Sequence, residues 1–221
     1  MKKRVLIFCL AYYPSFTSGA EAALKEITDR ISPEEIEFHL VTLRWDASLL
    51  REEQVGNVHV HRIGITKAQK PTFEDLGKWP LDLNKPLFQF LAAWKGLMLH
   101  RQYRFDGIWA MMAHSAGVPA AIFKLFHKDV PYVLTLQEGD PPEQIEKTLK
   151  PLWPLFTRAF TEATVVQAIS QFLGEWARRR HFTGPLEIIH NGANPRDVAN
   201  EVPEEEVERA RARAFNGPGL A

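Results

Sequence analysis

Two short stretches of the sequence combine residue types that could bind an anion or attack an ester. The first is Ser18-Gly19-Ala20, which follows an apolar run beginning at Val5 and precedes apolar residues at helical spacing over 22–31. A strand that turns directly into a helix offers free N–H groups to an anion, and glycine has no Cβ to hold a phosphate away. This pattern predicts an anion-binding loop, with a plain turn as the alternative.

The second stretch is Ala113-His114-Ser115-Ala116-Gly117, between an expected strand and an expected helix. It matches a relaxed form of the nucleophile elbow, with alanine in place of the first glycine. A serine hydrolase using Ser115 would also need an acid and a histidine, and Asp140 with His181 or His190 follows in the right chain order. Against this alternative, the residue before the serine is bulky, and the elbow leaves little room for a Cβ at its first position.

Metal and cofactor chemistry have little support in the sequence. His59 and His61 lie two apart in an expected strand and so share a face, which is one way to begin a metal site. No third ligand stands at a suitable spacing, so we expect no metal. No G-x-G-x-x-G follows the first strand and no Walker A pattern occurs, so we expect no nucleotide cofactor.

The composition is that of a globular protein of one large domain, or of one domain with a tail. Of 221 residues, 45% are hydrophobic and 24% are charged. Lys+Arg 27 balances Asp+Glu 27, which disfavours a nucleic-acid partner and leaves a small neutral or anionic ligand. The single cysteine, Cys9, lies in the first apolar run, so we expect a buried thiol and a reducing, cytoplasmic setting.

The N-terminal residues allow two interpretations. Lys2, Lys3 and Arg4 followed by VLIFCLA resemble the start of a signal peptide, but no small-residue cleavage site follows. A strand buried on both faces of a parallel sheet also appears as a continuous apolar run, and we favour the strand. No stretch approaches the ~18 apolar residues that a membrane span requires.

The chain alternates strand and helix signals. This alternation predicts an α/β fold, a Rossmann-like parallel sheet with helices on both faces. Beyond the first strand, the expected strands cover residues 37–43, 58–63, 106–113, 132–136, 164–169 and 186–189, and the expected helices cover 22–31, 87–100, 118–127, 145–160 with an interruption, and 172–180.

The expected helix over 87–100 carries large apolar residues over much of its circumference. With Trp79 and the flanking cations Lys95, Arg101 and Arg104, it could lie on a membrane surface. The alternative is a helix packed on the sheet. From Glu201 the composition turns charged and almost free of apolar residues, which predicts a solvated helix or linker.

The motifs in order resemble the N-terminal domain of family 4 glycosyltransferases, the retaining two-domain GT-B enzymes. The similar residues are YYPSFTSGAE at 12–21, AMMAHSAG at 110–117, VPYVLTLQEGDP at 130–141, VVQAIS at 165–170 and LEIIHNGANP at 186–195. The resemblance covers about residues 1–195.

This resemblance implies the acceptor-side domain of an enzyme that moves a sugar from a nucleotide-diphosphate donor to an acceptor hydroxyl. It implies a diphosphate loop at Ser18, Gly19 and Ala20, and a catalytic role for His114. The remaining residues that it places at the acceptor or cleft are Gln137, Glu138, Asp140, Ser170, Asn191 and Gly192. Catalysis in such enzymes is positioning plus stabilisation of the departing diphosphate.

Three departures from the family pattern stand out. The loop has one glycine where the family has a pair, Gln137 replaces the usual histidine or arginine, and Glu138 replaces a small residue. Glu21 and Glu138 would both oppose a diphosphate unless they face away, and Glu21 is explained more simply as a first-turn helix residue.

The sequence therefore predicts one domain over residues 1–199 and a charged linker or helix over 200–221, without the family's donor-binding domain. We expect such a chain to be inactive alone, with a nucleotide-sugar donor, a glycan or lipid-linked acceptor and a C-terminal domain partner. The alternative is a non-catalytic binding module that docks on a separate donor-binding subunit. The expected location is cytoplasmic, at the inner face of the membrane.

Overall fold

The computed structural model of the chain describes residues 2–15, 18–67 and 70–192. Residues Met1–His190 form one compact unit, and Asn191–Ala221 form a second one. The predicted boundary at residue 199 and the predicted linker or helix over 200–221 lie outside the described residues.

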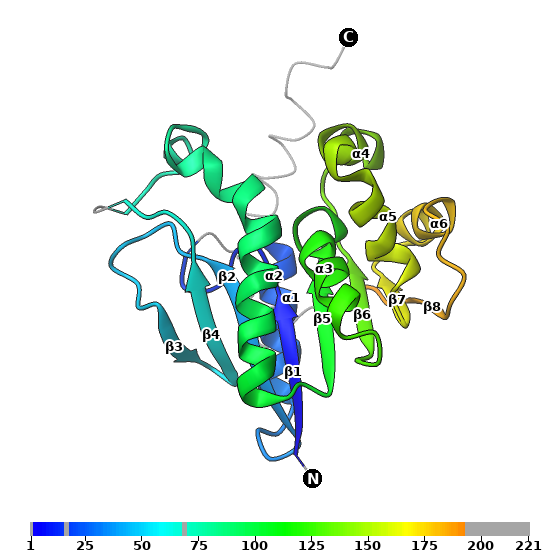
Figure 1. The fold of residues 1–221 in the computed structure, drawn as a ribbon, viewed down its shortest axis with the longest axis horizontal. Helices are drawn as coiled ribbons and strands as arrows, with labels where there is room; N and C mark the ends of the chain where they lie inside the picture. Colours follow the sequence, from blue (N-terminus) through cyan, green and yellow to red (C-terminus); the bar gives the residue numbers. More distant parts are fainter. Residues whose placement is uncertain (1, 16–17, 68–69, 193–221) are drawn as a thin grey trace, which may run out of the picture. The chain divides into compact units, whose positions relative to one another are not determined.

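One eight-stranded sheet runs through the compact unit, in the order β3-β4-β2-β1-β5-β6-β7-β8 (Figure 1). All neighbouring strands pair in parallel except β3, which is antiparallel to β4 at the sheet's edge. The strands are β1 (Lys3–Phe8), β2 (Ile36–Leu43), β3 (Glu52–Val55), β4 (Val58–Ile63), β5 (Gly107–Met111), β6 (Tyr132–Leu136), β7 (Val165–Ala168) and β8 (Leu186–Ile188).

Helices cover both faces of this sheet. Helix α1 packs on one face, while α2, α3, α5 and α6 contribute to the larger core on the other. Figure 1 shows α2 and α3 in front of the sheet and α1 behind it. The helices are α1 (Gly19–Arg30), α2 (Asn84–Tyr103), α3 (Val118–Phe126), α4 (Pro142–Leu149), α5 (Trp153–Thr161) and α6 (Gln171–Arg179), with short helical turns η1 (Asp75–Gly77), η2 (Leu81–Leu83), η3 (Ala113–Gly117) and η4 (Lys150–Leu152).

The predicted α/β class and its parallel sheet are confirmed, with two local differences. Strand β3 was not predicted, and α2 begins at Asn84, before the expected start at residue 87. The interruption expected within 145–160 is present, because α4 and α5 are separate helices joined by η4. Pro151 and Pro154 stand at this junction and lack the N–H groups that would continue α4 without a break.

The apolar N-terminal run forms β1, as predicted. β1 pairs with β2 on one side and with β5 on the other, so its backbone groups are satisfied within the sheet. Leu6 and Phe8 enter the larger core and Ile7 and Cys9 the smaller one, all with no exposed surface. Among the described residues, no helix has both the length and the apolar character needed to cross a membrane.

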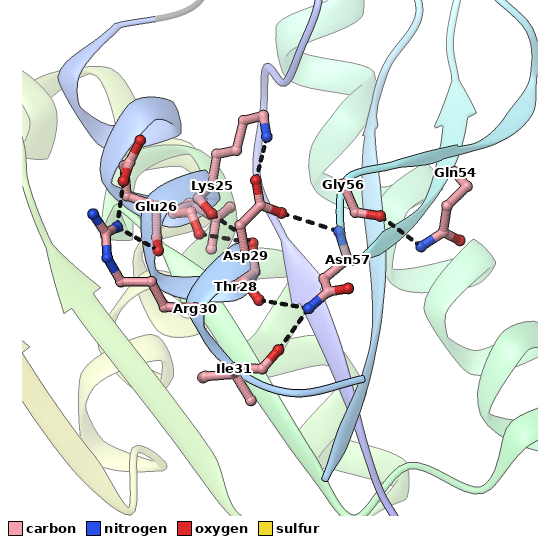
Figure 2. A network of polar contacts seen from close by, with 10 residues as sticks. Lys25, Glu26, Thr28, Asp29, Arg30, Ile31, Gln54, Gly56 and Asn57 are labelled. Atoms are coloured by element: carbon pink, nitrogen blue, oxygen red, sulfur yellow. Dashed lines mark hydrogen bonds and ion pairs between the residues drawn. The ribbon is translucent and has the colours of Figure 1, made fainter. Parts of the chain in front are cut away.

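A polar network ties the end of α1 to the turn between β3 and β4 (Figure 2). Asn57 donates its backbone N–H to Asp29 Oδ1 at 3.0 Å and its side-chain amide to the carbonyl of Thr28 at 3.3 Å. Gly56 has φ +56°, and a Cβ there would lie 2.2 Å from Asp29 Oδ1. The turn therefore requires glycine both for its backbone angle and for the close approach of Asp29.

Gly56→Ala is expected to lower the free energy of unfolding by about 1–3 kcal/mol, from the left-handed backbone and the displaced Asp29 carboxylate. Urea denaturation measures this loss. In an Asp29→Ala background the same substitution should cost less, because only the backbone term remains. An equal cost in both backgrounds would show that the contact with Asp29 contributes nothing.

Candidate functional site

Most of the predicted site residues lie in loops that follow β1 and the strands on one side of it. The strand order of the sheet changes direction at β1. From β1 the chain proceeds to β2 on one side, and it returns to place β5 on the other side of β1. Because the strands are parallel, the loops after β1, β5, β6 and β7 all lie at the same edge. In open α/β sheets ligands bind in the crevice outside the strand ends at this switch point.

At the end of the loop after β1, α1 begins with a capping box formed by Ser18 and Glu21. The Glu21 carboxylate accepts the backbone N–H of Ser18 at 2.7 Å and also accepts the Ser18 hydroxyl. Glu21 is a buried first-turn residue, as predicted. Gly19 has open space where a Cβ would stand, so the first turn of α1 is unobstructed at this position.

Glu138, in the loop after β6, accepts hydrogen bonds from the turn after β5. Glu138 Oε1 accepts the backbone N–H of Ala113 and, at 3.4 Å, that of His114. Met112, just before this turn, has φ +69° and donates its own N–H to the carbonyl of Thr135 at 2.9 Å. The Glu138 side chain has no exposed surface, so it supports the turn and does not line an open cleft.

Several polar atoms around this turn are buried without a hydrogen-bond partner within the described structure. They are Gln89 Oε1, His114 Nδ1, Ser115 Oγ and Glu138 Oε2. His114 Nδ1 lies 3.9 Å from Glu138 Oε1, which is too long for a direct hydrogen bond, and 31% of its side chain is exposed. Unsatisfied buried polar groups are rare, so their gathering here makes the β5 turn the candidate functional site.

The hydrolase alternative is wrong on geometry. Ser115 lies within η3, a π-helical turn, and its hydroxyl is buried with no partner to act as a base. The backbone angle expected of an elbow belongs to Met112, not to Ser115. Gly117 is explained by packing, since a Cβ there would lie 2.8 Å from Cβ of Ala159 in α5.

The other predicted cleft residues lie on three loops. Gln137 is half-buried and Asp140 is exposed in the loop after β6. Ser170 accepts the N–H of Leu173 at 3.3 Å and so caps α6. Asn191 and Gly192 are exposed and belong to the second unit of the chain.

Sequence reasoning missed Gln89, whose side-chain amide donates to the carbonyl of His114 at 3.4 Å. Gln89 is a buried polar residue on the apolar inner side of α2. That interruption is the only signal in the sequence that could have indicated it, because its partner lies 25 positions away.

A second polar cluster lies under α2, near the amino ends of β2 and β4. His39 Nε2 lies 2.9 Å from Glu37 Oε1, and His39 Nδ1 lies 3.0 Å from His61 Nε2. His61 Nδ1 in turn lies 3.3 Å from Glu52 Oε1. His59 stacks on His39 with ring centroids 4.9 Å apart.

Within this cluster, ligand atoms of Glu37, His39 and His59 lie within 4.8 Å of one another and could hold a metal ion. The sequence had suggested only the pair His59 and His61. Of these, His59 belongs to the possible metal-binding group with Glu37 and His39, whereas His61 lies between His39 and Glu52. Lys2 and Arg4 lie 3.3 Å and 3.5 Å from the other oxygen of Glu37 and oppose a further cation. The absence of a metal stays a prediction.

The sequence profile of glycosyltransferase family 4 matches residues 17–197. The chain belongs to glycosyltransferase family 4. No curated protein matches it in a sequence comparison.

Solved structures share the fold at low sequence identity. HepE from Anabaena, in complex with UDP and glucose, is 18% identical with a TM-score of 0.54, covering 96% of this chain and 50% of that one. Sucrose-phosphate synthase from Thermosynechococcus elongatus is 14% identical with a TM-score of 0.58, covering 87% and 49%. The N-terminal domain of Candida albicans trehalose-6-phosphate phosphatase is 11% identical with a TM-score of 0.62, covering 100% and 56%.

These comparisons confirm the N-terminal, Rossmann-like GT-B type of domain that the motifs predicted. The family 4 chain spans about half the length of these three structures.

In this family 4 domain, Glu138→Ala is expected to lower the free energy of unfolding by about 1–3 kcal/mol, because the N–H of Ala113 loses its buried acceptor. Glu138→Gln keeps an acceptor oxygen and should cost less. Urea denaturation compares the two, with Glu187→Ala, at an exposed carboxylate on β8, as the control for lost charge. Unchanged stability in Glu138→Ala would contradict the supporting role.

The buried histidines of the second polar cluster predict a loss of stability on acidification. This loss should begin at pH values above those at which ordinary carboxylates titrate. Burial lowers the pKa of His61 to about 4 from 6.5, and burial likewise lowers the pKa of His39. The unfolded chain therefore binds more protons below pH 6.5. Stability should fall as the pH drops through this window, by an amount on the order of 3 kcal/mol for His61.

Urea unfolding measured at a series of pH values tests this dependence. In His61→Gln the stability should fall less on acidification, at pH values above those at which carboxylates titrate. His190→Gln, at an exposed histidine, should show the same fall as the unsubstituted chain. Stability that increases on acidification would instead show that the two rings share an extra proton between the carboxylates of Glu37 and Glu52.

Proposed function

We propose that this chain is the acceptor-side half of a retaining glycosyltransferase that uses a nucleotide-diphosphate sugar. The observation that carries the proposal is the adjacency of β1 and β5 at the switch point of a family 4 fold, since the loop before α1 follows β1 and the His114 turn follows β5. The neighbour HepE was solved with UDP and glucose, which supports a sugar nucleotide as the donor class.

In the proposed reaction the bond between the anomeric carbon and the diphosphate oxygen breaks. The acceptor hydroxyl oxygen forms the new bond on the same face of the sugar, and its proton leaves with the diphosphate. This chain would contribute orientation, with His114 contacting the sugar and the first turn of α1 facing the diphosphate through Ser18, Gly19 and Ala20. Gln137, Asp140, Ser170, Asn191 and Gly192 are proposed to lie on the acceptor side.

We propose that transfer needs a second, donor-binding half and that the family 4 domain alone is inactive. The carboxylates of Glu21 and Glu138 already occupy backbone N–H groups in the two loops, which leaves fewer donors for a diphosphate. A non-catalytic module that docks on a separate donor-binding subunit is the alternative. This alternative predicts a stable complex with that subunit, and it predicts that the complex is unchanged when His114 is replaced.

The acceptor is proposed to be a glycan or a lipid-linked sugar, taken up in the cytoplasm at the inner face of the membrane. Burial raises the pKa of the Cys9 thiol, which keeps it protonated and unreactive. A free thiol of this kind suits a reducing compartment. Peripheral contact with the membrane is proposed on the outer face of α2.

His114→Ala is expected to lower kcat/KM by about 100-fold, the order of loss seen when one polar group at a reacting centre is removed. The assay combines the chain with a donor-binding half, in one polypeptide or as separate subunits, and measures nucleotide diphosphate release from a panel of sugar nucleotides. His181→Ala, at an exposed histidine after α6, is the control and should retain full activity.

Two results would overturn this proposal. The first is sugar transfer or donor hydrolysis by the purified chain without any partner. The second is a His114→Ala variant that remains fully active in the assembled enzyme.

A further inference from the structure

Helix α2 carries a row of large apolar side chains on the side that faces away from the sheet. The row is Leu83 immediately before the helix, then Leu87, Phe90, Leu91, Trp94 and Met98, each at least 40% exposed. Trp94 reaches 65%, which is far from the burial normally found for tryptophan in a packed helix. The opposite side of α2 is also apolar, and its Phe88, Ala92 and Leu99 belong to the core.

A groove runs along the seam between α2 and α3, which lie side by side in Figure 1. It encloses about 470 Å³, and its lining includes Phe90, Trp94, Met98, Arg101, Phe126 and His127. Phe126 is 67% exposed, so α3 extends the apolar row of α2 sideways. An apolar surface of this extent on a single chain marks an interaction site.

The charges that α2 itself carries have one sign. Residues 84–105 contain Lys85, Lys95, Arg101 and Arg104 and no acidic residue, although the whole chain has equal numbers of acids and bases. Lys95 pairs with Glu52 at 2.8 Å. Within the described structure Lys85, Arg101 and Arg104 form no ion pair, and the nearest acids in the sequence, Asp82 and Asp106, lie beyond the two ends of α2.

We infer that the outer face of α2 and the α2–α3 groove dock on an anionic lipid surface. A helix with apolar and tryptophan side chains flanked by unpaired cations fits the boundary between acyl chains and anionic headgroups. Self-association through the same face is disfavoured, because a two-fold contact would bring like cations of both copies together. The inference rests on the proposed function only for its purpose, the supply of a lipid-linked acceptor.

Vesicle co-sedimentation at low salt tests this docking independently of any sugar transfer. The chain should bind vesicles of phosphatidylcholine with about one third phosphatidylglycerol, bind pure phosphatidylcholine at least tenfold less, and release at high salt. Trp94→Glu and Phe90→Glu should each reduce binding at least tenfold. The double variant Lys85→Gln, Arg101→Gln should lose the preference for anionic vesicles.

Phe172→Glu is the matched control, because Phe172 is an exposed aromatic residue, at 55%, on α6 and outside this surface. It should bind vesicles as the unsubstituted chain does, and circular dichroism should show all variants folded. Failure of the unsubstituted chain to bind anionic vesicles would overturn the inference, as would binding that Trp94→Glu leaves unchanged. A dimer that Trp94→Glu dissociates, without vesicle binding, would identify a second copy as the occupant and also overturn it.

Discussion

The structure depends on the central position of β1. This strand is hydrogen-bonded on both edges, and its last three residues are fully buried, so its carboxyl end is firmly held. From β1 the chain adds β2, β4 and β3 on one side, and it then crosses to the other side of β1 to form β5 and the strands after it. This topology brings the loops after β1 and β5 to neighbouring strand ends, which is where ligands bind in open α/β sheets.

The two carboxylates of these loops stabilise the fold itself. Glu21 occupies the N–H of Ser18 at the start of α1, and Glu138 occupies the N–H groups of Ala113 and His114. Both therefore stabilise turns whose backbone donors would otherwise be unsatisfied. Both also place a carboxylate beside the loops that are proposed to face the sugar and the diphosphate, and under that proposal the contacts that shape the loops also weaken anion binding by this domain alone.

The sequence predicted those parts of the fold that local pattern specifies. The β6 run YVLTL is apolar and bounded by proline and glutamine, and its predicted limits agree with the structure. Strand β3 was missed because Glu52-Glu53-Gln54-Val55 lacks an apolar face, and its only pairing is at the sheet edge with β4. Local pattern cannot show a strand that exists because its neighbour offers free hydrogen-bonding groups.

The site was predictable as a set of loops but not as a set of contacts. Glu138 was expected in the cleft, yet its side chain turns beneath the β5 loop, where the positive φ of Met112 exposes the N–H of Ala113 to it. His39 went unnoticed because its two histidine neighbours, His59 and His61, lie on another strand, brought beside it by the register of β2 and β4. Such contacts join residues that are at least 20 positions apart, and no spacing rule contains them.

Helix α2 connects the candidate site with the candidate docking surface through adjacent residues. Gln89 points inward and donates to the carbonyl of His114, while Phe90 is exposed and lines the groove towards α3. Gly96 lets the helix lie directly on the sheet, since a Cβ there would be 2.7 Å from Phe8. Because α2 packs this closely on β1, a lipid surface bound to its outer face would have a defined orientation relative to the His114 turn. An acceptor held in that surface would then approach the crevice from one defined side, which is the positioning that sugar transfer requires.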